Sequence, residues 1–264
     1  MQSQTQREKT TTLAGTDSDW EEWGKSDPYY AVLSAPKFRR GALDGSALNE
    51  FFSSGSEHVD HVLSVLQRNF RSDFKPRRSL DFGCGVGRVA VPLARHSGSL
   101  TAVDISPTML HEAARNAASQ GVDNIDFLQT GELGSIAPGS LDLVHSYIVF
   151  QHIPPNRGKV LFQELLRKLK PGGLGALHLT VARNAPFAKR MIASVRRRSG
   201  IANRVANLLQ NRPASGPAIY MFTYSLSNIV FSLRANGCEQ MFTEFTQHSD
   251  YLGAILYFEK TSLL

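Results

Sequence analysis

The sequence has only two cysteines in 264 residues and no long apolar run, and these shortages exclude several classes of protein. Cys84 and Cys238 lie far apart along the chain, so we expect no disulfide framework and a reducing, cytoplasmic setting. Because no run of about 18 apolar residues occurs, no membrane-spanning helix is expected. Residues 1–19 lack the apolar core of a secretory signal, and their Gln, Thr and Ser content predicts a disordered tail.

Metal-ligating patterns are also scarce. His58 and His61 are three residues apart on an expected helix with Glu57 beside them, but no third ligand is evident. We therefore interpret this segment as a solvated helix face and predict no metal site.

Residues 20–264 have the size and composition of a single globular domain, since 42% of the whole chain is apolar and 20% is charged.

The most informative motif spans residues 80–90, Leu-Asp-Phe-Gly-Cys-Gly-Val-Gly-Arg-Val-Ala. An apolar, strand-like stretch runs into glycines at 83, 85 and 87 and then into a helix-like segment. Glycine tolerates positive φ and lets a ligand approach the backbone closely. Asp104 ends the next apolar run, where a carboxylate can hold a pair of ribose hydroxyls. This order of strand, turn and helix predicts a cofactor site.

The spacing of the glycines distinguishes between cofactors. A dinucleotide fingerprint, Gly-x-Gly-x-x-Gly, fits only from Gly85, with Ala90 in its third position. The pattern Asp81-x-Gly83-x-Gly85-x-Gly87 fits better, and it resembles motif I of the class I S-adenosylmethionine-dependent methyltransferases. An acid before the first glycine suits a ligand with ammonium and sulfonium groups better than an anionic pyrophosphate. An NAD-dependent oxidoreductase remains the weaker alternative.

The rest of the chain agrees with this family. We expect helices at 56–70, 88–96, 107–119, 156–170 and 226–235, and strands at 79–83, 99–104, 124–128, 141–146, 174–181, 239–246 and 252–260. The link 247–251 is too short for a parallel crossover, so the last two strands should be antiparallel neighbours. The resemblance covers about 56–181 and 220–260. It predicts an α/β, Rossmann-like, mostly parallel seven-stranded sheet with a reversed final strand and helices on both faces.

The resemblance also implies cofactor contacts. The backbones of Gly83 and Gly85 would contact the methionine part of S-adenosylmethionine, and Asp81 would hold its amino group. Asp104 would accept both ribose hydroxyls. Product S-adenosylhomocysteine would occupy the same site.

The remaining cofactor contacts concern the adenine and the turn. Ile105 and Met109 would pack on the adenine, although Met109 fits a helix core equally well. Thr130, or Gln129 beside it, stands where the family often has an acid that accepts from the adenine amino group. Three further cofactor-binding candidates lie in the turn and the fourth strand: Cys84, Gly87 and His145, the last with a structural role as its alternative.

The segment after the fourth strand, residues 147–155, should border the transferring methyl group, since the carboxyl ends of parallel strands face the ligand crevice. His152 is the catalytic candidate: a histidine with an ordinary pKa of about 6.5 can take a proton from an acceptor hydroxyl. A capping or packing role is its alternative. Tyr147 and Gln151 are candidates for orienting the acceptor.

Two segments lie outside the minimal fold. Residues 20–55 are rich in aromatic side chains and form a predicted N-terminal lid, in which Tyr29 and Tyr30 are substrate-binding candidates and the tryptophans are packing residues. Residues 183–218 form a predicted helical insertion with eight Lys or Arg residues and no acid. This insertion suits an anionic acceptor, or peripheral contact of 183–212 with an anionic membrane. A solvated hairpin is the alternative.

We therefore interpret the chain as a methyltransferase that acts on an O or N atom of a small-molecule or glycan-like, possibly anionic, acceptor. The Asn-Pro-Pro-Tyr type motif of nucleic-acid and glutamine methylation is missing, because His145-Ser-Tyr stands in its place. Nucleic acid is therefore a disfavoured partner, and a nucleic-acid or protein methyltransferase is the alternative. A non-catalytic S-adenosylmethionine-binding protein stays open. The sequence does not predict the oligomeric state.

Overall fold

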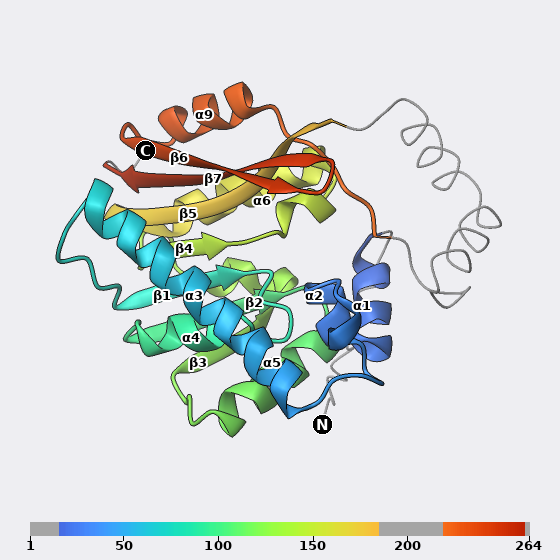
Figure 1. Cartoon of the computed structure of the whole chain (residues 1–264). Helices are drawn as coiled ribbons and strands as arrows, with labels where there is room; N and C mark the ends of the chain where they lie inside the picture. The colour runs from blue at the N-terminus through green and yellow to red at the C-terminus, as the bar shows by residue number, and fades with distance from the viewer. Residues whose placement is uncertain (1–15, 185–218, 262–264) are drawn as a thin grey trace, which may run out of the picture.

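The computed structural model describes residues 16–184 and 219–261, and its centre is one seven-stranded sheet (Figure 1). The strands are β1 (Arg78–Phe82), β2 (Ser99–Asp104), β3 (Ile125–Gln129), β4 (Leu141–Ser146), β5 (Leu169–Arg183), β6 (Met241–His248) and β7 (Tyr251–Lys260). Their order is β3-β2-β1-β4-β5-β7-β6, and β7 runs antiparallel to both of its neighbours. The predicted fold class, including the reversed final strand, is confirmed.

Helices cover both faces of this sheet. On one face α3 (Gly45–Asn69), α4 (Ala90–Arg95) and α5 (Pro107–Ser119) pack into one apolar cluster, and Figure 1 shows α3 lying across the front of the strands. On the other face α6 (Pro155–Lys168) and α9 (Leu226–Ala235) pack into a second cluster. The sheet is therefore covered on both sides, and every residue of β4 and all but the first of β1 are buried.

Local signals explain the elements that match the expected boundaries. Ser106 caps α5, because its hydroxyl accepts from the Met109 amide at 3.1 Å, and Pro107 begins the helix. Ser225 caps α9 in the same way. The fifth strand begins earlier than expected: α6 ends at Lys168, since Leu169 already pairs with Leu141 of β4.

The N-terminal segment forms α1 (Thr16–Ser26), α2 (Pro28–Val32) and a short 3₁₀ turn (Pro36–Phe38). The expectation of disorder through Asp19 is wrong for residues 16–19, which are helical. This first turn is held because Asp17 pairs with Arg157 of α6 at 2.5 Å. Residues 1–15 lie outside the described residues.

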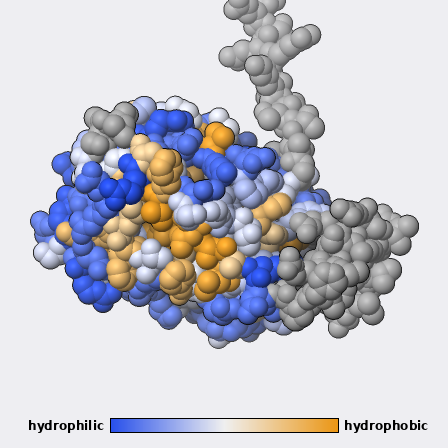
Figure 2. Space-filling view, turned by 90° about the horizontal axis from the view of Figure 1, so that it is seen from above, coloured by the Kyte–Doolittle hydropathy of each residue, from blue (hydrophilic) through white to orange (hydrophobic). Residues whose placement is uncertain are grey.

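The predicted basic insertion lies almost wholly outside the described residues. Arg183 is the last residue of β5 rather than part of a helix, and residues 185–218 are not described. Over the described ranges, no helix is both long and apolar enough to cross a membrane. Figure 2 shows a strip of apolar residues on the side where α9 and β6 lie, and Phe231 and Phe245 of these elements are 75% and 61% exposed.

Helix α3 rests on the backbone of the glycine-rich turn. A Cβ atom on Gly55 would lie 1.9 Å from the Arg88 carbonyl oxygen, so only glycine permits this approach. Gly55→Ala is expected to destabilise the protein by about 1–3 kcal/mol through overpacking. Gly45→Ala in the same helix has open space around it and is expected to be neutral or slightly stabilising. Urea unfolding of both variants measures the difference, and equal stabilities would contradict the proposed contact.

Candidate functional site

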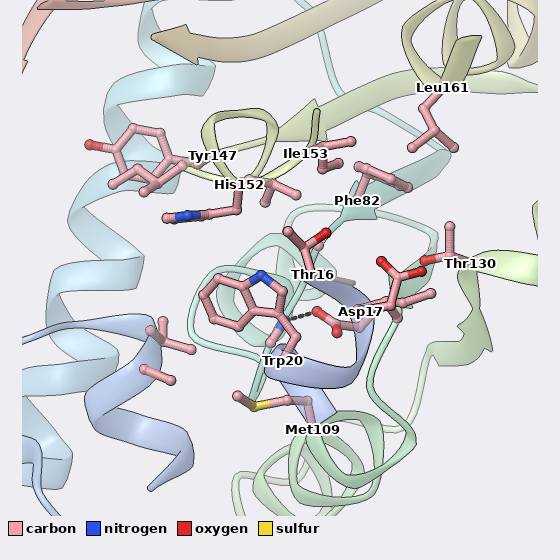
Figure 3. A pocket seen from close by; sticks show the side chains of 18 of the residues that line it. Thr16, Asp17, Trp20, Phe82, Met109, Thr130, Tyr147, His152, Ile153 and Leu161 are labelled. Atoms are coloured by element: carbon pink, nitrogen blue, oxygen red, sulfur yellow. Dashed lines mark hydrogen bonds between the residues drawn. The ribbon is translucent and has the colours of Figure 1, made fainter. Parts of the chain in front are cut away.

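A pocket opens where the glycine-rich turn, the end of β2 and the segment after β4 meet (Figure 3). Helix α1 borders it from the N-terminal segment. The sequence-predicted residues that line the pocket are Gly83, Gly85, Asp104, Ile105, Met109, Thr130, Tyr147 and His152. The sequence-predicted residues outside its lining are Asp81, Cys84, Gly87, His145, Gln151, Tyr29 and Tyr30.

Asp104 is fixed at one end of the pocket by backbone amides. Its Oδ2 accepts from the Gly85 amide at 2.8 Å, and its Oδ1 accepts from the Ser106 amide at 2.9 Å. Burial raises the pKa of Asp104, and these amide hydrogen bonds act in the opposite direction. Each carboxylate oxygen keeps a further lone pair, so this carboxylate can still accept from ligand hydroxyls.

The glycine-rich turn places backbone without side chains next to Asp104 in the pocket lining. Gly83 has φ +77° and Gly85 has φ +54°, and a Cβ atom at Gly83 would lie 2.3 Å from the Val149 side chain. The side chain of Cys84 is buried among the core residues of α3 and α4, and burial raises the pKa of its thiol. Gly87 packs against Val91 and Ala113. The turn thus offers a cradle at Gly83 and Gly85, whereas Cys84 and Gly87 serve its packing.

Arg88 carries a buried charge at the edge of the pocket. Its side chain is 6% exposed and donates to the Ser54 hydroxyl at 3.3 Å, while its Nε has no hydrogen-bond partner. Burial lowers the pKa of Arg88, and the nearby Asp81 carboxylate partly opposes this. No ion pair to Arg88 occurs within the described ranges. A buried guanidinium without a bound carboxylate suits an anionic group of a ligand.

His152 lies at the other end of the pocket, at the end of a 3₁₀ turn (Phe150–His152). Its Nδ1 lies 2.8 Å from the Tyr220 carbonyl oxygen, so Nδ1 carries the proton and donates. Its Nε2 then accepts from Gln151 Nε2 at 3.0 Å, and Gln151 itself accepts from Thr180. Burial lowers the pKa of His152 to about 4, so the expectation of an ordinary pKa near 6.5 is wrong.

The aromatic residues of the N-terminal segment differ from expectation: Tyr29 and Tyr30 lie outside the pocket lining, and Trp20 lies in it. The Tyr29 hydroxyl lies 2.8 Å from Glu112 and 2.9 Å from Asn116, and burial together with Glu112 raises its pKa to about 12. Tyr30 is buried beneath the Arg39 guanidinium. Both tyrosines therefore belong to the apolar core of the N-terminal segment. Trp20, which we expected to be a packing residue, lines the pocket with its ring 4.9 Å from the His152 ring (Figure 3).

Sequence reasoning missed the part of the site that α1 contributes with α6. Thr16, Asp17 and Arg157 line the pocket, and the ion pair of Asp17 with Arg157 joins residues 140 positions apart. No local sequence pattern predicts an ion pair between residues so far apart in the chain. The amphipathic character of residues 16–26 was the signal available for a packed helix.

The histidine pair on α3 is not a solvated face. His58 Nε2 lies 3.0 Å from His145 Nε2, and burial, with smaller contributions from His145 and Arg88, lowers the pKa of His58 to about 2. His61 is exposed and pairs with Glu244. In the part of the chain that the structure describes, no group of His, Cys, Asp or Glu is arranged to hold a metal ion.

Comparison with known proteins agrees with this geometry. Residues 80–173 match the model of a family described as a methyltransferase domain. The chain is 32% identical over 120 residues to the mitochondrial ubiquinone biosynthesis O-methyltransferase of Schizosaccharomyces pombe, covering 45% of this chain and 42% of that protein. It is 32% identical over 130 residues to the ubiquinone biosynthesis O-methyltransferase of Paracidovorax citrulli, covering 47% and 53%. The match thus spans about half the length of these relatives.

Solved structures share the fold at lower identity. Magnesium protoporphyrin IX methyltransferase from Synechocystis, solved with S-adenosylhomocysteine, has a TM-score of 0.57 at 19% identity and covers 89% of this chain and 97% of its own. The N-methyltransferase NodS from Bradyrhizobium japonicum has a TM-score of 0.57 at 15% identity and covers 94% and 100%. Residues 80–173 thus match a methyltransferase domain, and the fold of the described residues is that of class I S-adenosylmethionine-dependent methyltransferases.

Proposed function

We propose that the protein transfers the methyl group of S-adenosylmethionine to a hydroxyl oxygen of a small, largely apolar acceptor. The observation that carries this proposal is one pocket whose lining includes both the glycine-rich turn with Asp104 and the side chains of Trp20 and His152. Both sequence relatives described above are named O-methyltransferases, which favours oxygen over nitrogen.

The residues at the first end fit S-adenosylmethionine. Asp104 is held by two amides and can accept from the ribose hydroxyls, while Ile105 and Met109 border the space next to it. Gly83 and Gly85 line the pocket without side chains, so the methionine chain can lie against their backbone. Arg88 supplies a guanidinium for the methionine carboxylate.

The residues at the second end fit an apolar acceptor with one hydroxyl. Ile153 and Leu161 line the same pocket as Trp20 and His152, so an aromatic or prenyl-like body can exclude water from it. His152 is neutral at physiological pH, and its Nε2 can accept a proton when Gln151 yields its hydrogen bond. The bound cofactor supplies an electrophilic methyl on a sulfonium, and the rings of Trp20 and Tyr147 can stabilise that positive charge. The protein aligns the hydroxyl oxygen and removes its proton.

Two measurements test the proposal. We expect calorimetry to show binding of S-adenosylhomocysteine and no binding of NAD⁺ at the same concentration. With labelled S-adenosylmethionine, we expect transfer to alkylated catechols or phenols and much less transfer to the corresponding anilines or to RNA. Preference for anilines would overturn the oxygen specificity. Binding of S-adenosylhomocysteine without transfer to any hydroxyl, amine or nucleic acid would favour a non-catalytic binding protein.

A further inference from the structure

Three side chains form a hydrogen-bonded row beside the cofactor end of the pocket. Asp81 of β1 accepts at Oδ1 from His145 Nδ1 of β4 at 2.7 Å, and His145 Nε2 lies 3.0 Å from His58 Nε2 of α3. Because the Asp81 carboxylate is a pure acceptor, His145 carries its proton on Nδ1. His145 Nε2 then accepts, and His58 donates from Nε2. The ionised carboxylate thus sets the tautomers of both rings.

Burial, ring stacking and strand pairing hold these three side chains in place, so the orientation of Asp81 is well defined. Asp81 and His145 are 2% and 3% exposed. The His58 ring stacks on the Tyr147 ring with a centroid distance of 3.9 Å, and Tyr147 lines the pocket. β1 and β4 are paired so that Asp81 and His145 are direct partners in register. Rotation of any one side chain would break a buried contact of the next.

One atom of this row has no partner. Asp81 Oδ2 is buried and accepts no hydrogen bond from the residues that the structure describes, although an unpaired buried carboxylate oxygen is costly. Asp81 lies close enough to Arg88 and Asp104 for their charges to interact, which places it beside two residues of the pocket. Arg88 is the matching cation whose Nε is also unpaired. An amino acid group, with one ammonium and one carboxylate, is the ligand chemistry that satisfies both.

We infer that His145, held by His58, is a positioning residue that occupies Asp81 Oδ1 and thereby leaves Oδ2 available to bind the cofactor ammonium. This inference rests on the proposed function. The imidazole Nδ1–H binds one carboxylate oxygen of Asp81 and leaves the other oxygen able to accept from the ammonium. His58 of α3 holds the His145 ring in place and packs on Tyr147, but it does not itself line the pocket. Neither histidine contacts the methyl group.

The test compares two ligands that differ only at the amino acid end. S-adenosylhomocysteine carries the ammonium, and 5′-methylthioadenosine lacks the whole amino acid group. We expect His145→Leu to weaken S-adenosylhomocysteine binding about 5–20-fold, as part of a charged hydrogen bond is lost. Binding of 5′-methylthioadenosine should stay within about twofold, which also shows that the pocket is folded. His145→Asn places an amide donor near the Nδ1 position and should restore most of the affinity.

Two further variants complete the experiment. His58→Phe keeps a ring against Tyr147 but removes the hydrogen bond, and it should weaken S-adenosylhomocysteine binding less than His145→Leu does, again without changing 5′-methylthioadenosine binding. It also serves if His145→Leu fails to fold. His61→Gln, an exposed histidine on the same helix, is the matched control and should bind both ligands normally. Equal losses for both ligands, or no loss for either, would overturn the positioning role. A wild-type protein that fails to bind S-adenosylhomocysteine would instead overturn the proposed function.

Discussion

Asp104→Ala is expected to weaken S-adenosylmethionine binding by about 10–100-fold, which corresponds to about 1.5–3 kcal/mol for hydrogen bonds to a charged group. The substitution removes the acceptor proposed for both ribose hydroxyls. It also frees the Gly85 and Ser106 amides that now bind the carboxylate, so the glycine cradle loses a fixed point. Calorimetric titration of the folded variant with S-adenosylhomocysteine measures the loss.

Two companion variants make this result specific. Asp104→Asn keeps one acceptor oxygen and should fall between wild type and Asp104→Ala. Asp126→Ala, on the neighbouring strand β3, removes an exposed acid outside the pocket lining and should leave the affinity unchanged. Since burial raises the pKa of Asp104, wild-type affinity should begin to fall at a higher pH than for an ordinary carboxyl as the solution is acidified. Unchanged affinity in Asp104→Ala would refute the ribose site.

His152→Ala is expected to lower turnover by about 10²–10⁴-fold while cofactor affinity stays nearly constant, if His152 accepts the acceptor's proton. His152 lines the pocket, and its Nδ1–H donates a hydrogen bond to the Tyr220 carbonyl oxygen. The Nε2 lone pair is therefore the basic site. As the bond from methyl to oxygen forms, the hydroxyl becomes more acidic, so a weak base within hydrogen-bond distance suffices. His96→Ala, an exposed histidine outside the pocket lining, is the control and should behave as wild type.

The pH profile separates this role from simple alignment. A histidine with an ordinary pKa would lose activity below about pH 6.5 as it protonates. The pKa of His152 is lowered to about 4, so it stays neutral until the solution is far more acidic. We therefore expect the wild-type rate to stay level through pH 6.5 and to fall only near pH 4, over the range in which the protein stays folded. A His152→Ala turnover within a few-fold of wild type would assign catalysis to proximity and desolvation, with Trp20 and Tyr147 as positioning residues.

The elements of the fold follow from local signals, and these are readable in the sequence. Ser106-Pro107 specifies the start of α5 by capping and by a preset φ, and the glycines at 83 and 85 specify a turn that other residues would strain. The short link before Tyr251 forces an antiparallel pair. Such signals act within a few residues, so they predicted the sheet and its reversed strand, and the Gly83, Gly85 and Asp104 that they singled out line one pocket.

The acceptor end depended on contacts that no local pattern carries. Trp20 enters the pocket because Asp17 pairs with Arg157, and Tyr29 leaves it because Glu112 and Asn116 bind its hydroxyl. The pKa of His152 is set by burial beneath Trp20, which residue type does not reveal. The sequence by itself determined the strand–turn–helix unit and the glycines of its turn. Only the tertiary structure decided which aromatic and titratable groups meet in the pocket, because desolvation and pairing arise between residues far apart in the chain.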